Sequence, residues 1–225
     1  MTKLIIDISK YVLLVLIALY ALQSYIIFKK KNEEAREFLF LRQNVLMFAI
    51  HFIAFTVFYL KMDESTLFYF YGAQAIYLGA VLVLFRNLYP RASKLLVNNM
   101  CMLITIGFIM LTRISYDQSM KQFKILALAT VVALIVPILI KKLKFLDKLG
   151  YLYALGGIGL LGVVLVFAKF SYGSKLSISI GGFTFQPSEF VKIIFVFAAA
   201  SLLAKYTDFK HVVITTAIAG AHVLI

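Results

Sequence analysis

Long uninterrupted apolar runs recur along this chain and set the strongest limit on its fold. Eight such runs cover roughly residues 8–28, 44–60, 67–85, 95–112, 123–140, 150–168, 188–204 and 209–225. Most are about 17–20 residues long, the length that an α-helix needs to cross a hydrocarbon layer of about 30 Å. None alternates between apolar and polar residues as the strands of a membrane β-barrel do. The runs therefore predict an all-α, polytopic transmembrane helix bundle with about eight spans.

Composition argues against the soluble alternatives. Hydrophobic residues make up 63% of the 225 residues and charged residues only 15%, which is more apolar surface than a soluble domain can bury. The net charge of +13 is carried at the ends of the apolar runs and not in a separate basic domain, so we expect no nucleic-acid partner. One cysteine, three histidines and ten acidic residues show no metal-ligand spacing, so we expect no metal and no other cofactor.

The distribution of basic residues predicts the orientation in the membrane. Fourteen of the 23 lysine and arginine residues follow odd-numbered runs: Lys29, Lys30, Lys31, Arg36, Arg42, Arg86, Arg91, Lys94, Lys141, Lys142, Lys144, Lys148, Lys205 and Lys210. Loops rich in Lys and Arg stay on the cytoplasmic side. The odd-numbered spans therefore exit into the cytoplasm, and the N-terminus and the 171–188 segment lie outside.

Two parts of the chain differ in where their polar residues stand. Residues 1–92 contain three runs with polar residues mainly at their ends, and residues 93–225 contain five runs with polar residues on the predicted outer face. Pro90 marks a turn between these parts. We predict an N-terminal three-helix membrane extension at 1–92 and a second membrane domain at 93–225. The last run reaches Ile225 without a basic or interfacial anchor, so we expect the sequence to be a fragment of a longer protein.

The polar, glycine-rich segment Ser171–Ser188 stands between two of the apolar runs. Apolar and polar residues alternate on both sides of Gly181-Gly182, which predicts a short hairpin or re-entrant segment at the membrane surface. A plain connecting loop is the alternative reading of the same residues.

The end of this segment has the chemistry of a helix start. Pro187 fits the first helical position, with Gln186 as the cap and Ser188 second. Glu189 is third, where a negative charge suits the helix dipole, and Lys192 follows at a spacing that allows an ion pair on one face. Two charges just inside a span usually face a bundle interior or a wet cavity. An ordinary helix start with a local ion pair explains the same residues.

Residues inside other runs are expected to serve packing. Gly156, Gly159 and Gly162 recur every three residues and would let a neighbouring helix approach closely. Gln74 and His222 lie within spans, where we expect each to be a hydrogen-bonded residue of the bundle.

The segment from Gly173 to Lys192 resembles the signature of the SEDS family (shape, elongation, division and sporulation), whose members include RodA, FtsW and SpoVE. Its Gln186-Pro187-Ser188-Glu189-Phe190-Val191-Lys192 stretch is a strong match to the family pattern. The glycine-rich sixth run and the expected outer loop Arg113–Gln122, with Asp117 and Lys121 spaced to pair, are similar as well. The likeness covers about residues 95–225, the first half of the family's ten-helix core. Leu176-Ser177 stands where the family has Arg-Trp, and the chain contains no tryptophan.

The resemblance implies a peptidoglycan glycosyltransferase that joins lipid II into glycan strands during cell elongation, division or sporulation. It implies the bacterial cytoplasmic (inner) membrane, with a class B penicillin-binding protein as the partner that supplies transpeptidation. The candidates for substrate binding or a polar cavity are then Lys175, Gln186, Pro187, Ser188, Glu189 and Lys192. The family's candidate catalytic aspartate lies beyond Ile225, so we expect residues 1–225 alone to be inactive. A lipid-linked precursor transporter (flippase) and a non-catalytic membrane scaffold are the alternatives.

Overall fold

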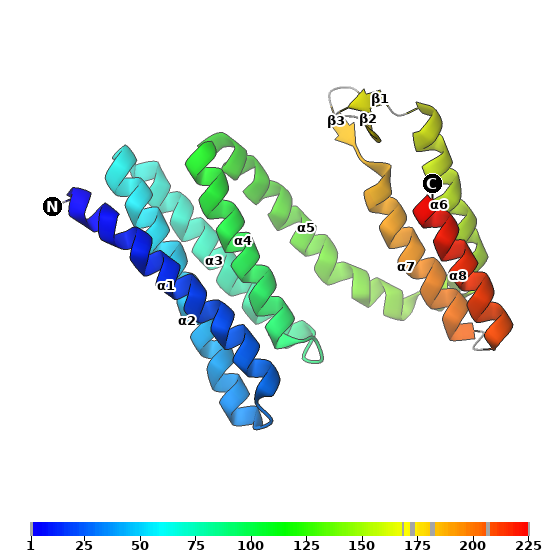
Figure 1. Cartoon of the computed structure of the whole chain (residues 1–225), viewed down its shortest axis with the longest axis horizontal. Coiled ribbons are helices and arrows are strands. Elements are labelled where there is room, and N and C mark those ends of the chain that lie inside the picture. Colours follow the sequence, from blue (N-terminus) through cyan, green and yellow to red (C-terminus); the bar gives the residue numbers. More distant parts are fainter. Residues whose placement is uncertain (1, 168, 172–173, 181–182, 206–207, 225) are drawn as a thin grey trace. The chain divides into compact units, whose positions relative to one another are not determined.

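The computed structural model describes residues 2–167, 169–171, 174–180, 183–205 and 208–224. Within these ranges the chain is almost entirely helical, with three short strands before α7 (Figure 1). The helices are α1 (Thr2–Lys29), α2 (Glu33–Met62), α3 (Ser65–Leu88), α4 (Lys94–Ile114), α5 (Tyr116–Lys142), α6 (Gly150–Phe167), α7 (Pro187–Lys205) and α8 (Phe209–Leu224), with a short 3-10 helix, η1 (Lys144–Lys148), before α6. They correspond one to one with the eight predicted runs, which confirms the fold class.

Length and composition mark this chain as a multi-pass membrane protein. In the described ranges six helices are long and apolar enough to cross a bilayer: α1 to α5 and the Pro187–Ala204 part of α7. The helices α6 and α8 have 18 and 16 residues, which at 1.5 Å per residue is close to the shortest span of a hydrocarbon core.

Several helices run further than the apolar runs because their polar ends are capped. Asn32 ends the turn before α2, and its side chain accepts a hydrogen bond from the Glu34 N–H at 2.9 Å. At the other end Asp63 adopts a left-handed conformation (φ 52°), and its N–H donates to the Tyr59 carbonyl at 2.8 Å. These hydrogen bonds pair backbone N–H and C=O groups at the helix ends, which apolar side chains cannot do.

The expected loop Arg113–Gln122 is wrong, because most of this segment is helical. α4 ends at Ile114 and α5 begins at Tyr116, so Ser115 alone joins them. The Ser115 N–H donates to the Leu111 carbonyl at 2.8 Å, and the Ser115 hydroxyl accepts from the Gln118 N–H. One serine thus closes one helix and caps the next. Asp117 and Lys121, both in the described part of the chain, form no ion pair there.

The chain forms two compact units, Met1–Ile135 and Val136–Ile225. The division falls within α5, next to Pro137, which cannot donate the helical hydrogen bond to residue 133. α4 packs against α2 and α3 and so belongs to the first unit. The predicted division into an N-terminal extension at 1–92 and a second membrane domain at 93–225 stays a prediction.

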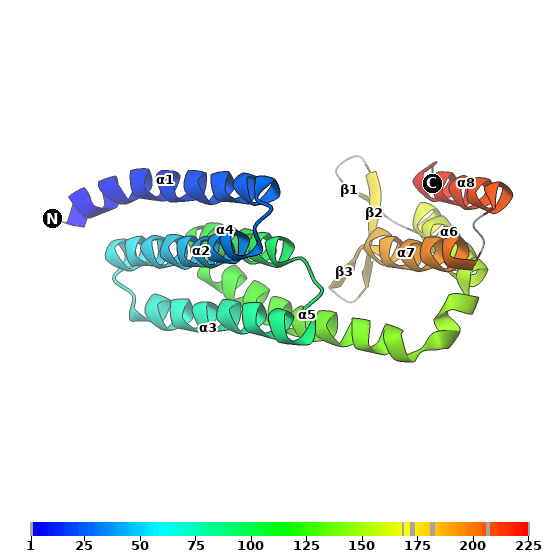
Figure 2. The ribbon, with the colours of Figure 1, turned by 90° about the horizontal axis from the view of Figure 1, so that it is seen from below.

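In the first unit α2 lies between α1 and α3 and also packs on α4 (Figure 2). The largest buried cluster includes Met47, Ile50 and Leu78, none of them more than 1% exposed. Polar side chains join the same helices. Asn98 of α4 donates to the Gln43 amide oxygen of α2 at 3.2 Å, and Gln43 donates to the Ser24 hydroxyl of α1 at 2.7 Å. Such interhelical bonds hold spans together where burial of apolar surface drives little association.

The second unit places α6 against α7, with α8 packed on both. Close approach depends on small residues here: a Cβ at Gly150 would lie 3.1 Å from the Ser201 Cβ. A three-stranded antiparallel sheet, β1 (Lys169–Ser171), β2 (Ser174–Ile180) and β3 (Phe183–Phe185), stands between the end of α6 and the start of α7. The pairing Ile180↔Phe183 confirms the predicted hairpin, while Gly181-Gly182 lie outside the described residues.

The glycines of α6 that allow close packing are not the three predicted. An added Cβ would meet nothing within 4 Å at Gly156, Gly159 or Gly162. At Gly157 it would lie 2.5 Å from Nε2 of His222 on α8. The regular spacing of three glycines was misleading, because the position of the neighbouring helix decides which glycine is needed.

Two fully buried polar residues pair between α2 and α3. Gln74 Oε1 accepts from His51 Nε2 at 2.9 Å, and both side chains are 0% exposed. This confirms the expectation for Gln74. Among the described residues, His51 Nδ1 and Gln74 Nε2 have no further hydrogen-bond partner.

Replacing Gln74 with leucine should therefore lower the free energy of unfolding by about 1–2 kcal/mol, because it removes the hydrogen-bond partner of His51 Nε2. Adding His51→Phe to Gln74→Leu should recover most of that loss by removing the unpaired group. Unfolding titrations with sodium dodecyl sulfate in mixed micelles measure both changes. A double variant no more stable than Gln74→Leu would show that the hydrogen bond is not the cause.

The predicted orientation can be tested with single cysteines in a Cys101→Ser background. Ser177→Cys in β2 should react with a membrane-impermeant maleimide in intact cells, and Glu34→Cys and Phe145→Cys should react only after lysis. The opposite labelling pattern would reverse the orientation of every span.

Candidate functional site

The structure places a helix start at Pro187, as the sequence predicts. α7 begins at Pro187, and the Gln186 carbonyl accepts from the Glu189 N–H at 3.2 Å. Proline suits this position because its ring presets the backbone angle and its missing N–H would have no helical partner. Pro187 is buried and Ser188 is partly buried, whereas Gln186 is exposed.

Glu189 and Lys192 form the predicted ion pair. Lys192 Nζ donates to Glu189 Oε1 at 2.7 Å, one turn along the same helix. Their side chains are 56% and 70% exposed, so the pair lies on an open face of this chain. The pairing is confirmed. The expectation that the pair faces a polar cavity stays a prediction.

The opposite face of α7 is the one that packs. Val191, Ala198 and Leu202 recur at helical spacing and are at most 6% exposed. The open face continues from the ion pair into apolar residues, with Ile193 58% and Val196 63% exposed. α7 therefore presents a charged end followed by an apolar stripe, the arrangement that complements an amphiphile with a polar head and a long tail.

Lys175 belongs to the segment that leads into this site. Its backbone lies in β2, which packs against both α6 and α7. Its side chain lies outside the described residues, so the structure brings together only Gln186, Pro187, Ser188, Glu189 and Lys192 among the predicted site residues.

A second polar feature of the family-like part is His222 on α8. Its Nδ1 donates to the Ile218 carbonyl at 2.8 Å, and its Nε2 lies next to Gly157, 2.5 Å from where a Cβ would be. No partner for Nε2 is found in the described part of the chain. His222 is thus a hydrogen-bonded bundle residue, as expected, and it also sets the distance between α6 and α8.

Sequence reasoning missed a cluster of basic residues around two pockets in the first unit. Arg86, Arg91 and Lys94 were interpreted only as markers of orientation, but they surround pockets at the turn between α3 and α4. Their clustering around Pro90 within nine residues was the available signal.

Comparison with known proteins identifies the second half of the chain. The family model that covers FtsW, RodA and SpoVE, described as cell cycle protein, matches residues 93–225, more than half of the sequence. The match runs from α4 to α8 and includes the whole α7 site. No curated protein and no solved structure gives a significant match. The chain therefore belongs to the FtsW/RodA/SpoVE family of cell cycle membrane proteins.

Proposed function

We propose that the chain is part of a peptidoglycan glycosyltransferase that joins lipid II into glycan strands at the outer face of the bacterial cytoplasmic membrane. The observation that carries this proposal is the start of α7, where Pro187 opens the helix and Lys192 lies 2.7 Å from Glu189 on an open face. This site falls inside the family-matched segment. Family membership supports a role in building the cell wall during elongation, division or sporulation.

The chemistry of the α7 face fits a lipid-linked substrate. Glycosyl transfer from a lipid diphosphate breaks the bond between the sugar and the diphosphate, so negative charge develops on the leaving group. A positioned ammonium group stabilises such charge. In this proposal Lys192 contacts the diphosphate, Glu189 positions Lys192, and Lys175 supplies a second cation from β2. The exposed Ile193 and Val196 then lie along the first part of the lipid tail.

An apolar groove in the first unit also suits a lipid chain. A cavity of about 450 Å³ lies between α4 and α5, lined by Leu103, Phe108 and Leu126 with Gln122 as its polar member. α4 and the lining part of α5 both belong to the family-matched segment. The size and apolar lining of this groove suit a long hydrocarbon chain. We propose that it holds the lipid chain of the substrate and takes no part in the reaction.

The proposal includes a class B penicillin-binding protein as the partner. A polymerase that makes glycan strands leaves their peptides uncrosslinked, so a transpeptidase must act on the product. We place that activity in the partner, bound through the membrane spans.

Purified complete gene product incubated with lipid II tests the proposal. Glycan strands resolved by gel electrophoresis are the expected product. Movement of lipid II across vesicle membranes without strand formation would identify the protein as a flippase and contradict the proposal. If the protein shows neither activity but still binds its transpeptidase partner, a non-catalytic scaffold becomes the better interpretation.

A further inference from the structure

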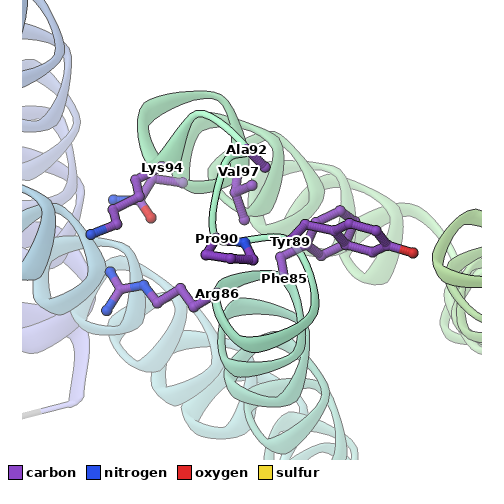
Figure 3. Close-up of a pocket in the computed structure, with 8 residues that line it drawn as sticks. Phe85, Arg86, Tyr89, Pro90, Ala92, Lys94 and Val97 are labelled. Carbon is purple, nitrogen blue, oxygen red and sulfur yellow. The ribbon is translucent and has the colours of Figure 1, made fainter. Parts of the chain in front are cut away.

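Four basic side chains surround the turn between α3 and α4. Arg86 and Lys94 line a cavity of about 170 Å³ that reaches Val97 and the buried Asn98. Arg36, Arg91 and Lys94 line an adjoining cavity of about 410 Å³, and the two share Pro90, Ala92 and Lys94. We call Arg36, Arg86, Arg91 and Lys94 the cationic pocket. Figure 3 shows Arg86 and Lys94 extending to the same side of the turn, with their nitrogen ends toward one another.

The positive charge of this pocket is only partly neutralised. Lys94 Nζ lies 2.6 Å from Glu37 Oε1, and Glu33 also lines the larger cavity. In the described part of the chain no acidic side chain pairs with Arg36, Arg86 or Arg91. Four cations thus face two acids.

The start of α4 adds to this imbalance. A negative charge is favourable in the first turn of a helix. α4 has no acid there and begins with Lys94, whose charge opposes the helix dipole. The Ser93 hydroxyl accepts from the Leu96 N–H at 3.4 Å, and Ser93 and Lys94 at this helix start both line the larger cavity. An anion bound between the helix end and the arginines would remove this conflict.

The depth of the pocket identifies the kind of anion. α3 and α4 have 24 and 21 residues, so each is about as long as a bilayer core is thick, and the turn between them lies at the membrane interface. Leu88 and Leu96, which flank the turn, are 49% and 70% exposed, as lipid-facing residues are. Lipid phosphates lie at this level, and basic pockets between spans bind anionic head groups.

We propose that the cationic pocket binds the phosphate of an anionic phospholipid head group, with Arg86 and Arg91 as its main ligands and the acyl chains along the apolar surface of Leu88 and Leu96. The occupant is a phosphodiester anchored in the bilayer and not free phosphate, because the apolar flank would add nothing to the binding of an inorganic ion. Either cavity has room for a group larger than the 10–15 Å³ that one water centre requires. This proposal does not rest on the proposed enzymatic function.

Native mass spectrometry of the detergent-solubilised complete gene product, titrated with phosphatidylglycerol, tests the proposal without a membrane surface potential. Arg86→Gln/Arg91→Gln should raise the apparent Kd for phosphatidylglycerol at least about tenfold, since two charge-assisted hydrogen bonds are lost. Arg86→Lys/Arg91→Lys should retain most of the affinity. The matched control, Arg42→Gln/Lys61→Gln, removes the same charge from exposed positions of α2 outside the pocket and should change the Kd less than about twofold.

Three results would overturn the proposal. An equal loss of affinity in the control variant would show that overall charge, and not the pocket, attracts the lipid. Equal binding of phosphatidylcholine would remove the role of an anionic head group. Displacement of phosphatidylglycerol by millimolar inorganic phosphate would make the free ion the occupant. Circular dichroism of each variant separates these outcomes from a failure to fold.

Discussion

Replacing Gly157 with alanine should lower the free energy of unfolding by about 1–3 kcal/mol, because the new methyl group has no room. Its Cβ would lie 2.5 Å from Nε2 and 3.1 Å from Cδ2 of His222. Rotation of the ring away from the methyl group would break the hydrogen bond from Nδ1 to the Ile218 carbonyl and disturb the contact with Phe195, whose ring centre lies 5.3 Å away. Either α6 and α8 separate or the hydrogen bond breaks. Dodecyl sulfate titration of the micelle-bound chain, followed by circular dichroism, measures the loss.

The neighbouring glycines supply matched controls for this experiment. Gly156→Ala and Gly159→Ala meet no atom within 4 Å, and alanine is the better helix former, so stability should stay the same or rise by up to about 1 kcal/mol. Adding His222→Ala to Gly157→Ala should recover most of the loss, because the ring that the methyl meets is gone. If Gly157→Ala is as stable as Gly156→Ala, the described packing of α6 on α8 is wrong.

The fold could be predicted because membrane thickness dictates the length of each apolar run. Every predicted run became a helix, whereas the ends were less predictable, since polar residues at the interface continue a helix when a cap is available. Asn32 extends α2 to Glu33 in this way. The segment Arg113–Gln122 was misjudged for the same reason: Ser115 serves both as the end of α4 and as the cap of α5, so no loop is required.

The candidate site was predictable only where it is local in sequence. Pro187, Glu189 and Lys192 lie within six residues, and helix geometry alone brings the charges together. The exposed fraction of these two side chains depends on which face of α7 packs against α6. The spacing of residues within α7 does not reveal that face.

Contacts between distant residues could not be read from the sequence. The cationic pocket needs Arg36 on α2 to lie at the same cavity as Arg91 and Lys94, more than fifty residues later. Gly157 matters only because of His222 on another helix. Basic residues beside a span have an ordinary explanation in the positive-inside bias. That explanation accounts for their presence at the helix ends but not for their positions around two adjoining cavities.

Replacing Glu189 or Lys192 with alanine should slow glycan-strand formation at least about tenfold in the complete gene product. One charge-assisted contact to the substrate diphosphate contributes about 1.5–3 kcal/mol, and loss of either residue removes or misplaces it. Stability should hardly change, because both side chains are more than half exposed and exposed ion pairs contribute about 0–1 kcal/mol. The double variant Glu189→Ala/Lys192→Ala should fold normally and stay slow.

The matched control for this pair lies in α1. Asp7 and Lys10 have the same spacing, a 3.3 Å separation and side chains 53% and 58% exposed, but they lie outside the family-matched segment. Asp7→Ala and Lys10→Ala remove an equivalent exposed ion pair, so they should leave the rate of strand formation unchanged.

Whether the start of α7 acts on a lipid-linked substrate can be decided from the initial rate of strand formation from purified lipid II. Wild-type protein, the two α7 variants and the two α1 variants are compared at equal concentrations of folded protein. We expect full rates for the wild type and both α1 variants, and rates at least about tenfold lower for Glu189→Ala and Lys192→Ala. Wild-type rates for both α7 variants would contradict this expectation and reduce the Glu189–Lys192 pair to an ordinary surface ion pair.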